Sequence, residues 1–190
     1  MEDELQGGPR RRPEDPRKQK RPRKVSPTYL ENAALHYLKR YAATRSQLQR
    51  VLTRKVDKSL KFHGGDRAEA LGWMEALIAK LIRNGLLNDE AYARMKAHSL
   101  RASGRSSRMI AQKLKLKGVA AETVQQKVAD ASAEVSEEDA ARIWARKKRL
   151  GPFRKDPGTR QDHRQKDLAA LARAGFAFGI AKKVIDSAPE

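Results

Sequence analysis

Cysteine is absent from this chain of 190 residues, and no apolar run approaches a membrane-spanning length. Without cysteine, the protein forms no disulfide, thiol redox centre or cysteine metal site, as is typical of a reducing compartment. A helix needs about 20 mostly apolar residues to cross a bilayer. The N-terminus also lacks the basic-then-apolar order of a secretory signal. We therefore expect a soluble, cytoplasmic protein without membrane association.

The usual sequence motifs of enzymes are missing too. The chain has no Gly-rich phosphate loop ending in Lys-Ser or Lys-Thr, no dinucleotide fingerprint and no zinc-protease motif. Its four histidines lie far apart, without the three- or four-residue spacing of metal-binding helices. The carboxylates between Glu134 and Asp139 are typical of a helix start, where they complement the helix dipole. We expect no catalysis, no metal and no cofactor.

Acidic residues are missing from one long stretch of the sequence. Between Glu90 and Glu122 lie eight basic residues and no acidic residue, and the whole chain carries a net charge of +19. Because like charges disfavour compaction unless they are neutralised, this stretch predicts a polyanion or an acidic protein surface as the partner. We expect nucleic acid, or an assembly of protein and nucleic acid.

The remaining pattern predicts a tail followed by helices. Residues 1–27 are rich in Pro, Arg and Lys and nearly without apolar side chains, which predicts a disordered basic tail. From Pro27 onward, apolar residues recur every three or four positions, with capping residues before the helices and glycines after them. No segment shows convincing strand alternation. We expect an all-α fold: an elongated tandem array of three three-helix modules at residues 28–86, 87–133 and 134–190.

Nine expected helices in three groups indicate an internal repeat. A shift of 57 positions aligns the second module with the third: Leu114 with Leu171, Gly118 with Gly175, Val119 with Phe176 and Val128 with Ile185. A shift of 62 positions aligns the second module with the first: Ile110 with Leu48 and Leu114 with Leu52. Tandem helical modules pack against their neighbours and form an extended body. This architecture favours binding along a long surface.

The expected helix at residues 105–117 illustrates how the basic side chains are presented. Ile110 and Leu114 are one turn apart and face the core, whereas Arg108, Gln112 and Lys115 share the opposite face. Two more basic series lie at residues 39–61 and 142–155. The candidate binding residues are Arg45 and Arg50 in the first module, Arg94, Lys96, Arg101, Arg105, Arg108 and Lys115 in the second, and Arg146, Lys147 and Lys148 in the third.

Two aromatic residues lie within the last basic series. Trp144 and Phe153 accompany its arginines and lysines, and such a mixture suits single-stranded nucleic acid, whose bases stack on aromatic rings. The helical spacing of Trp144 also fits a residue of the core, which is the interpretation we prefer.

Gly85 is followed by residues 86–93, Leu-Leu-Asn-Asp-Glu-Ala-Tyr-Ala. This segment resembles a conspicuous segment of the RecX family, bacterial regulators of the RecA recombinase. Residues 38–48 are similar to its first-module stretch and residues 104–119 to its second-module segment. The resemblance covers residues 28–130 well and 136–188 more loosely. Gln47 replaces the usual Glu, the arginine expected near Ala91 is missing, and Phe62 to Asp66 looks like an inserted loop.

The resemblance implies a fold and a function. RecX-like proteins are three tandem three-helix modules that lie in the helical groove of the RecA–DNA filament and dampen ATP hydrolysis, strand exchange and co-protease activity. For this chain, it therefore implies the RecA filament, with single-stranded and also double-stranded DNA, as partners of a monomer.

Two other functions remain open on the sequence alone. The first is a stand-alone DNA-binding protein, nucleoid-like or a helix-turn-helix regulator, for which Gln125 and Gln126 are candidate base-reading residues, although a solvated face suits them better. The second is an adaptor for an acidic protein, without affinity for DNA.

Overall fold

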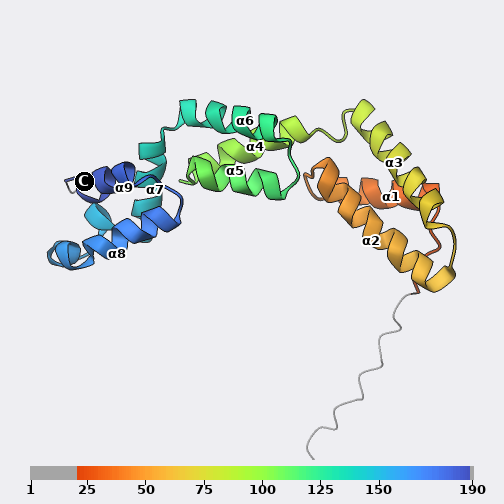
Figure 1. Ribbon diagram of the computed structural model, residues 1–190, viewed down its shortest axis with the longest axis horizontal. Helices are drawn as coiled ribbons and strands as arrows, with labels where there is room; N and C mark the ends of the chain where they lie inside the picture. The colour runs from red at the N-terminus through yellow and green to blue at the C-terminus, as the bar shows by residue number, and fades with distance from the viewer. Residues whose placement is uncertain (1–20, 189–190) are drawn as a thin grey trace, which may run out of the picture.

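The computed structural model describes residues 21–188, which form an arch of helices (Figure 1). Residues 1–20, which hold most of the predicted tail, lie outside the described residues. Within the described part, every regular element is helical, which confirms the all-α prediction. The α-helices are α1 (Pro27–Leu38), α2 (Arg45–His63), α3 (Arg67–Arg83), α4 (Asp89–Ala102), α5 (Ser107–Leu116), α6 (Ala121–Glu134), α7 (Glu137–Lys148), α8 (Arg160–Arg173) and α9 (Phe178–Ile185). Two 3₁₀ turns, η1 (Gly151–Phe153) and η2 (Pro157–Thr159), lie between α7 and α8.

Side-chain caps set most helix starts. An N-cap oxygen accepts a hydrogen bond from a backbone N–H of the first turn at α1 to α5 and at α7, which satisfies a donor that has no partner within its helix. These N-caps are Ser26, Thr44, Asp66, Asn88, Ser106 and Ser136. At Thr44 the Gln47 side chain accepts in return from the backbone N–H of Thr44, which completes a capping box.

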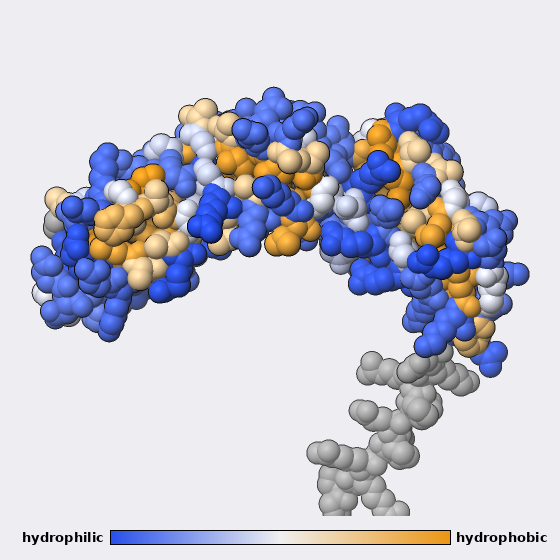
Figure 2. Space-filling view, viewed as in Figure 1, coloured by the Kyte–Doolittle hydropathy of each residue, from blue (hydrophilic) through white to orange (hydrophobic). Residues whose placement is uncertain are grey.

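Three separate hydrophobic clusters divide the arch into modules. The first lies among α1 to α3 around Leu30, Leu52 and Met74, the second among α4 to α6, and the third among α7 to α9. Figure 2 shows hydrophobic patches gathered within the bodies of the modules, with hydrophilic residues over most of the remaining visible face. Val25 is 8% exposed and belongs to the first cluster, so the predicted tail of residues 1–27 extends too far.

Some apolar residues of the helices are exposed. Leu35, Met95 and Leu116 continue the apolar spacing of their helices, yet 41%, 52% and 68% of their surfaces face solvent. Each module buries only one stripe of each helix, and these residues lie beside that stripe. Apolar spacing alone therefore does not identify which residues of a helix are buried.

The middle helices of the modules follow one another along the concave side of the arch. In Figure 1, α2, α5 and α8 lie along its lower edge, and the C-terminal end of each middle helix reaches the N-terminal end of the middle helix before it in the sequence. No helix of the described residues is long and apolar enough to cross a membrane.

Candidate basic interface

Equivalent residues join the modules at both places where one module meets the next. At the first joint, between the first and second modules, the Thr44 hydroxyl donates to the Lys117 carbonyl oxygen at 2.5 Å. At the second joint, the Ser106 hydroxyl donates to the Ala174 carbonyl oxygen at 2.6 Å. Each hydroxyl belongs to an N-cap and each carbonyl to a C-cap. The positive end of one middle helix therefore meets the negative end of the next, which aligns their dipoles.

A glycine follows the accepting carbonyl at each joint. Gly118 and Gly175 adopt φ of +80° and +91°, a backbone conformation that L side chains rarely adopt. A Cβ at Gly118 would overlap the side chain of Ser46, and one at Gly175 would lie 2.6 Å from the Ser106 Oγ. The repeated glycine thus permits both the turn and the close approach of two modules.

A carboxylate completes each joint. Asp89, the first residue of α4, accepts from the backbone N–H of Arg45 at 2.7 Å. Glu137, the first residue of α7, accepts from the backbone N–H of Ser107 at 3.1 Å. The predicted shift of 62 positions aligns Ser107 with Arg45, so both joints use the same backbone donor at the start of a middle helix.

Four adjoining grooves run along the middle helices, and none of their lining residues is acidic. Their volumes are about 840, 860, 510 and 240 Å³. Neighbouring grooves share lining residues: Arg54 joins the first two, Leu116 the second and third, and Arg108 the third and fourth. We call the lysines and arginines that the middle helices and their C-caps place along these grooves the basic row: Lys58, Lys55, Arg54, Arg50, Lys117, Lys115, Arg108 and Arg173.

Three of the candidate residues belong to the basic row. Arg50, Arg108 and Lys115 are exposed and line its grooves, and Arg50 Nη2 donates across the first joint to the Leu116 carbonyl oxygen at 3.4 Å. Arg45 is exposed at the first residue of α2 but does not line these grooves. Arg94, which is exposed, and Lys96, which is half-buried, lie on α4 and do not line the grooves either.

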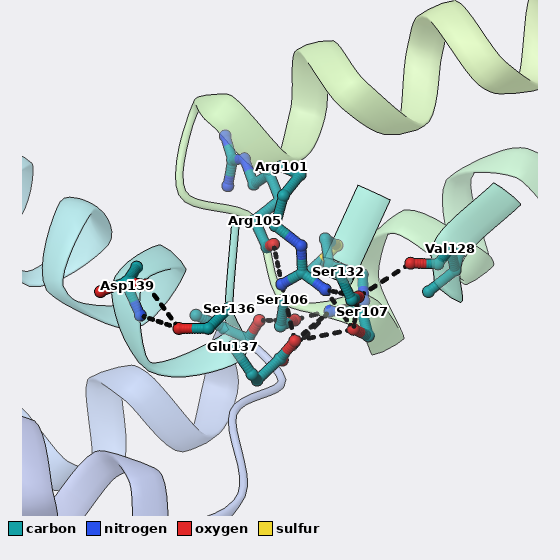
Figure 3. Close-up of polar contacts among 11 residues, drawn as sticks. Arg101, Arg105, Ser106, Ser107, Val128, Ser132, Ser136, Glu137 and Asp139 are labelled. Atoms are coloured by element: carbon teal, nitrogen blue, oxygen red, sulfur yellow. Dashed lines mark hydrogen bonds and ion pairs between the residues drawn. The ribbon is translucent and has the colours of Figure 1, made fainter. Parts of the chain in front are cut away.

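Arg101 is not a surface residue, so its prediction as a binding residue is wrong. Only 1% of Arg101 is exposed, and its guanidinium donates to Glu137 Oε2 at 2.6 Å (Figure 3). It also donates to the hydroxyls of Ser107 and Ser132 and to the Arg105 carbonyl oxygen. A buried guanidinium needs this many acceptors, because removing a charge from water is costly unless it is paired. Arg101 therefore fastens the second joint.

The remaining candidates lie at or near the second joint. The Arg105 Cζ is 4.4 Å from the centre of the Trp144 ring, and the Lys148 Nζ is 5.4 Å from it. Lys147 Nζ donates to the Ser103 carbonyl oxygen at 3.0 Å, from α7 back to the end of α4. The Arg146 Cζ lies 5.1 Å from the centre of the Phe153 ring. The half-buried Trp144 packs against the third cluster, as expected, and two cations lie over its ring.

The acidic residues near the second joint form ion pairs. Hydrogen bonds to Glu138, first from Lys183 and second from Arg142, lower the pKa of its carboxyl group. The bond from Lys183 also ties α9 to α7. Glu137 pairs with Arg101. Among the described residues no group of three or more His, Cys, Asp or Glu side chains is placed to hold a metal ion.

Sequence reasoning missed several residues of the basic row. Lys117 comes directly before Gly118 and Arg173 two residues before Gly175, so the sequence signal for them is the repeated joint glycine. The tyrosines of the first groove, Tyr29 and Tyr37, were missed as binding residues because their spacing is that of core residues. Gln125 and Gln126 are exposed on α6, as expected for a solvated face.

Comparisons with known proteins agree on one family. The family model "RecX, second three-helix domain" matches residues 88–127. "Regulatory protein RecX" of Myxococcus xanthus (strain DK1622) is 79% identical over 187 residues, which cover 98% of this chain and 99% of that protein. The protein of the same name from Agrobacterium fabrum (strain C58 / ATCC 33970) is 36% identical over 83% of this chain and 82% of its own. No solved structure matches. The chain belongs to the RecX family of regulatory proteins.

Proposed function

We propose that this protein is a mainly negative regulator of the RecA recombinase, which lies in the groove of the RecA–DNA filament. It restrains ATP hydrolysis, strand exchange and co-protease activity, and so acts in recombination, DNA repair and the SOS response. Membership of the RecX family supports this proposal. The observation that carries it is the basic row, which belongs to the middle helices along the concave side of the arch (Figure 1) and has no acidic residue along its grooves.

The dimensions of the basic row suit an extended partner. At 1.5 Å per residue, the 19 residues of α2 span about 28 Å and the 10 residues of α5 about 15 Å. The two helices follow one another end to end, so their grooves together form one extended basic surface. The mechanism is steric and electrostatic: a cytoplasmic monomer occupies the groove, pairs with acidic protein surface or DNA phosphate, and transforms no substrate.

ATP hydrolysis by RecA on single-stranded DNA tests the proposal. The protein is titrated at a fixed, near-physiological salt concentration, because salt weakens contacts to phosphate. Inhibition at less than one copy per recombinase subunit supports action on the filament. If hydrolysis falls only once the protein saturates the DNA, it competes for DNA instead, and the stand-alone DNA-binding protein is the better description.

A charge-reversed variant tests the basic row itself. Arg50→Glu, Arg108→Glu and Lys115→Glu together should abolish inhibition without loss of helicity, because all three side chains are exposed. The matched control reverses Arg83, Lys155 and Lys182, which are also exposed but do not line the grooves. Equal inhibition by the two triple variants would contradict the assignment of the basic row.

A further inference from the structure

One groove of the basic row differs from the others because tyrosines line it. This groove of about 840 Å³ lies between α1 and α2, where Tyr29 and Tyr37 stand beside Arg54, Lys55 and Lys58. It continues through Tyr37 and Arg54 into the groove at the first joint. None of the residues that line either groove is acidic. The first module thus offers flat aromatic surface and positive charge in one place.

The tyrosine rings are held in place by the hydrophobic core. Tyr29 and Tyr37 are half-buried and pack against the first cluster, while they also line the groove. The Lys55 Nζ lies 6.0 Å from the centre of the Tyr29 ring. Tyr41, which is 55% exposed, extends the aromatic surface, with its ring centre 5.2 Å from that of Tyr37. Rings fixed in this way lose little conformational entropy when a ligand stacks on them.

The segment before α1 adds positive charge to the same groove. His63 Nε2 donates to the Pro22 carbonyl oxygen at 2.7 Å, and Val25 is buried in the first cluster. These contacts hold the segment against α2, where Arg21 and Arg23 line the groove. The part of the predicted tail that the structure describes therefore lies against this site.

We propose that this groove binds an unpaired strand of DNA, whose bases stack on Tyr29 and Tyr37 while Arg54 and Lys58 neutralise its phosphates. Stacking on aromatic side chains in a positive groove is the general mode of single-strand binding. In a duplex the faces of the bases are covered by their neighbours and do not reach the tyrosines. An acidic protein segment would use the basic side chains but not the two rings. The inference rests on the proposed function for its biological setting, but its test needs no recombinase.

The test compares the affinity of the full chain for a labelled oligothymidylate and for a duplex of equal length by fluorescence anisotropy. Tyr29→Leu with Tyr37→Leu keeps the apolar packing and removes the rings. Because stacking contributes about 1–3 kcal/mol per base, single-strand affinity should fall at least about tenfold, while duplex affinity stays within about twofold. Tyr29→Phe with Tyr37→Phe keeps the rings and should bind the single strand as the wild type does.

Charge variants and cross-linking complete the test. Arg54→Met with Lys58→Met should weaken binding to both DNAs and lower the salt dependence, by about 0.7 per phosphate contact for the single strand. With the unaltered protein, an iododeoxyuridine-containing single strand should cross-link to Tyr29 or Tyr37. Any of three results would overturn the proposal. The cross-links are confined to other residues, or the leucine variant loses single-strand and duplex affinity equally. The third is that polyglutamate binds with the same dependence on the tyrosines. Because it uses DNA alone, this result is independent of the effect on ATP hydrolysis.

Discussion

The two joints of the arch share one construction but differ in what reinforces it. Both use an N-cap hydroxyl, a C-cap carbonyl, a glycine and a carboxylate at the first residue of the next module's first helix. At the second joint the carboxylate of Glu137 also pairs with the buried Arg101. At the first joint, Asp89 receives the backbone N–H of Arg45, and Lys39, which lies 62 positions before Arg101, is exposed. The second joint thus has one contact that the first lacks, the ion pair between the buried Arg101 and Glu137.

This difference implies different mobility at the two joints. All the extensive helix–helix contacts among the described residues lie within modules, so the contacts at the joints, polar ones among them, are few by comparison. We expect the second and third modules to move as one arm and the first module to bend relative to it. Because the chain has no cysteine, pairs of introduced cysteines can carry spin labels without interference. Exposed positions suit this purpose: Glu75 with Ala129 across the first joint, and Ala129 with Lys166 across the second.

Removal of Arg101 should have the largest effect. Arg101→Met leaves the Glu137 carboxylate and two serine hydroxyls without their cation, and breaking a buried pair in this way costs about 3–5 kcal/mol. Urea unfolding measures the loss in the free energy of unfolding. The distribution of spin-label distances across the second joint should broaden toward that across the first joint. The control, Arg94→Met, changes an exposed arginine on the same helix and should cost less than about 0.5 kcal/mol. Similar losses for the two variants would contradict the fastening role.

Substitution of a joint glycine should have the next largest effect. Gly118→Ala forces a side chain into a positive φ, at about 1–2 kcal/mol, and into the space of Ser46, at about 1–3 kcal/mol more. Gly85→Ala is a matched control, because Gly85 has φ of +70° but nothing within 4 Å of the added Cβ. Thermal unfolding of both variants separates backbone strain from the clash. If Gly85→Ala costs as much as Gly118→Ala, close approach at the first joint is not the reason for the glycine.

Deletion of the joint hydroxyls should have a smaller effect on stability and an unequal effect on motion. Thr44→Val and Ser106→Ala each remove an N-cap and one bond between modules, which costs about 1–2 kcal/mol. Only Thr44→Val should broaden the spin-label distances across its joint, because the second joint keeps Arg101 and Glu137. Equal broadening at both joints would show that the buried pair does not hold the second joint.

The sequence predicted the repeat itself but not the contacts between its units. N-caps and apolar spacing depend on neighbours along the chain, so Ser26, Thr44 and Asn88 were recognisable. The alignment of Gly118 with Gly175 marked the joint residues, although their partners Ser46 and Ser106 could not be inferred. A contact between modules depends on how two helices meet in space, which local patterns do not encode.

The same limit explains the errors at the candidate site. Charge and helical spacing indicated Arg108 and Lys115 correctly as exposed residues. Arg101 lies in the same basic stretch, and its burial depends on Glu137, which is 36 positions away. Tyr29 and Tyr37 follow the spacing of core residues because they contact the core and line a groove as well.

The cations around Trp144 should have the smallest effect. Arg105→Met removes the nearer cation, 4.4 Å from the ring centre, and Lys148→Met removes the one at 5.4 Å. Each cation–π contact at such a partly exposed site contributes about 0.5–1 kcal/mol, so both variants should unfold at slightly lower urea concentrations, with Arg105→Met the less stable. With Trp73→Phe as background, the fluorescence of Trp144 reports on the ring, and its emission should change more for Arg105→Met. Because Arg105 comes from the second module and Lys148 from the third, a larger change for Lys148→Met would mean that the ring senses its own module more than the joint.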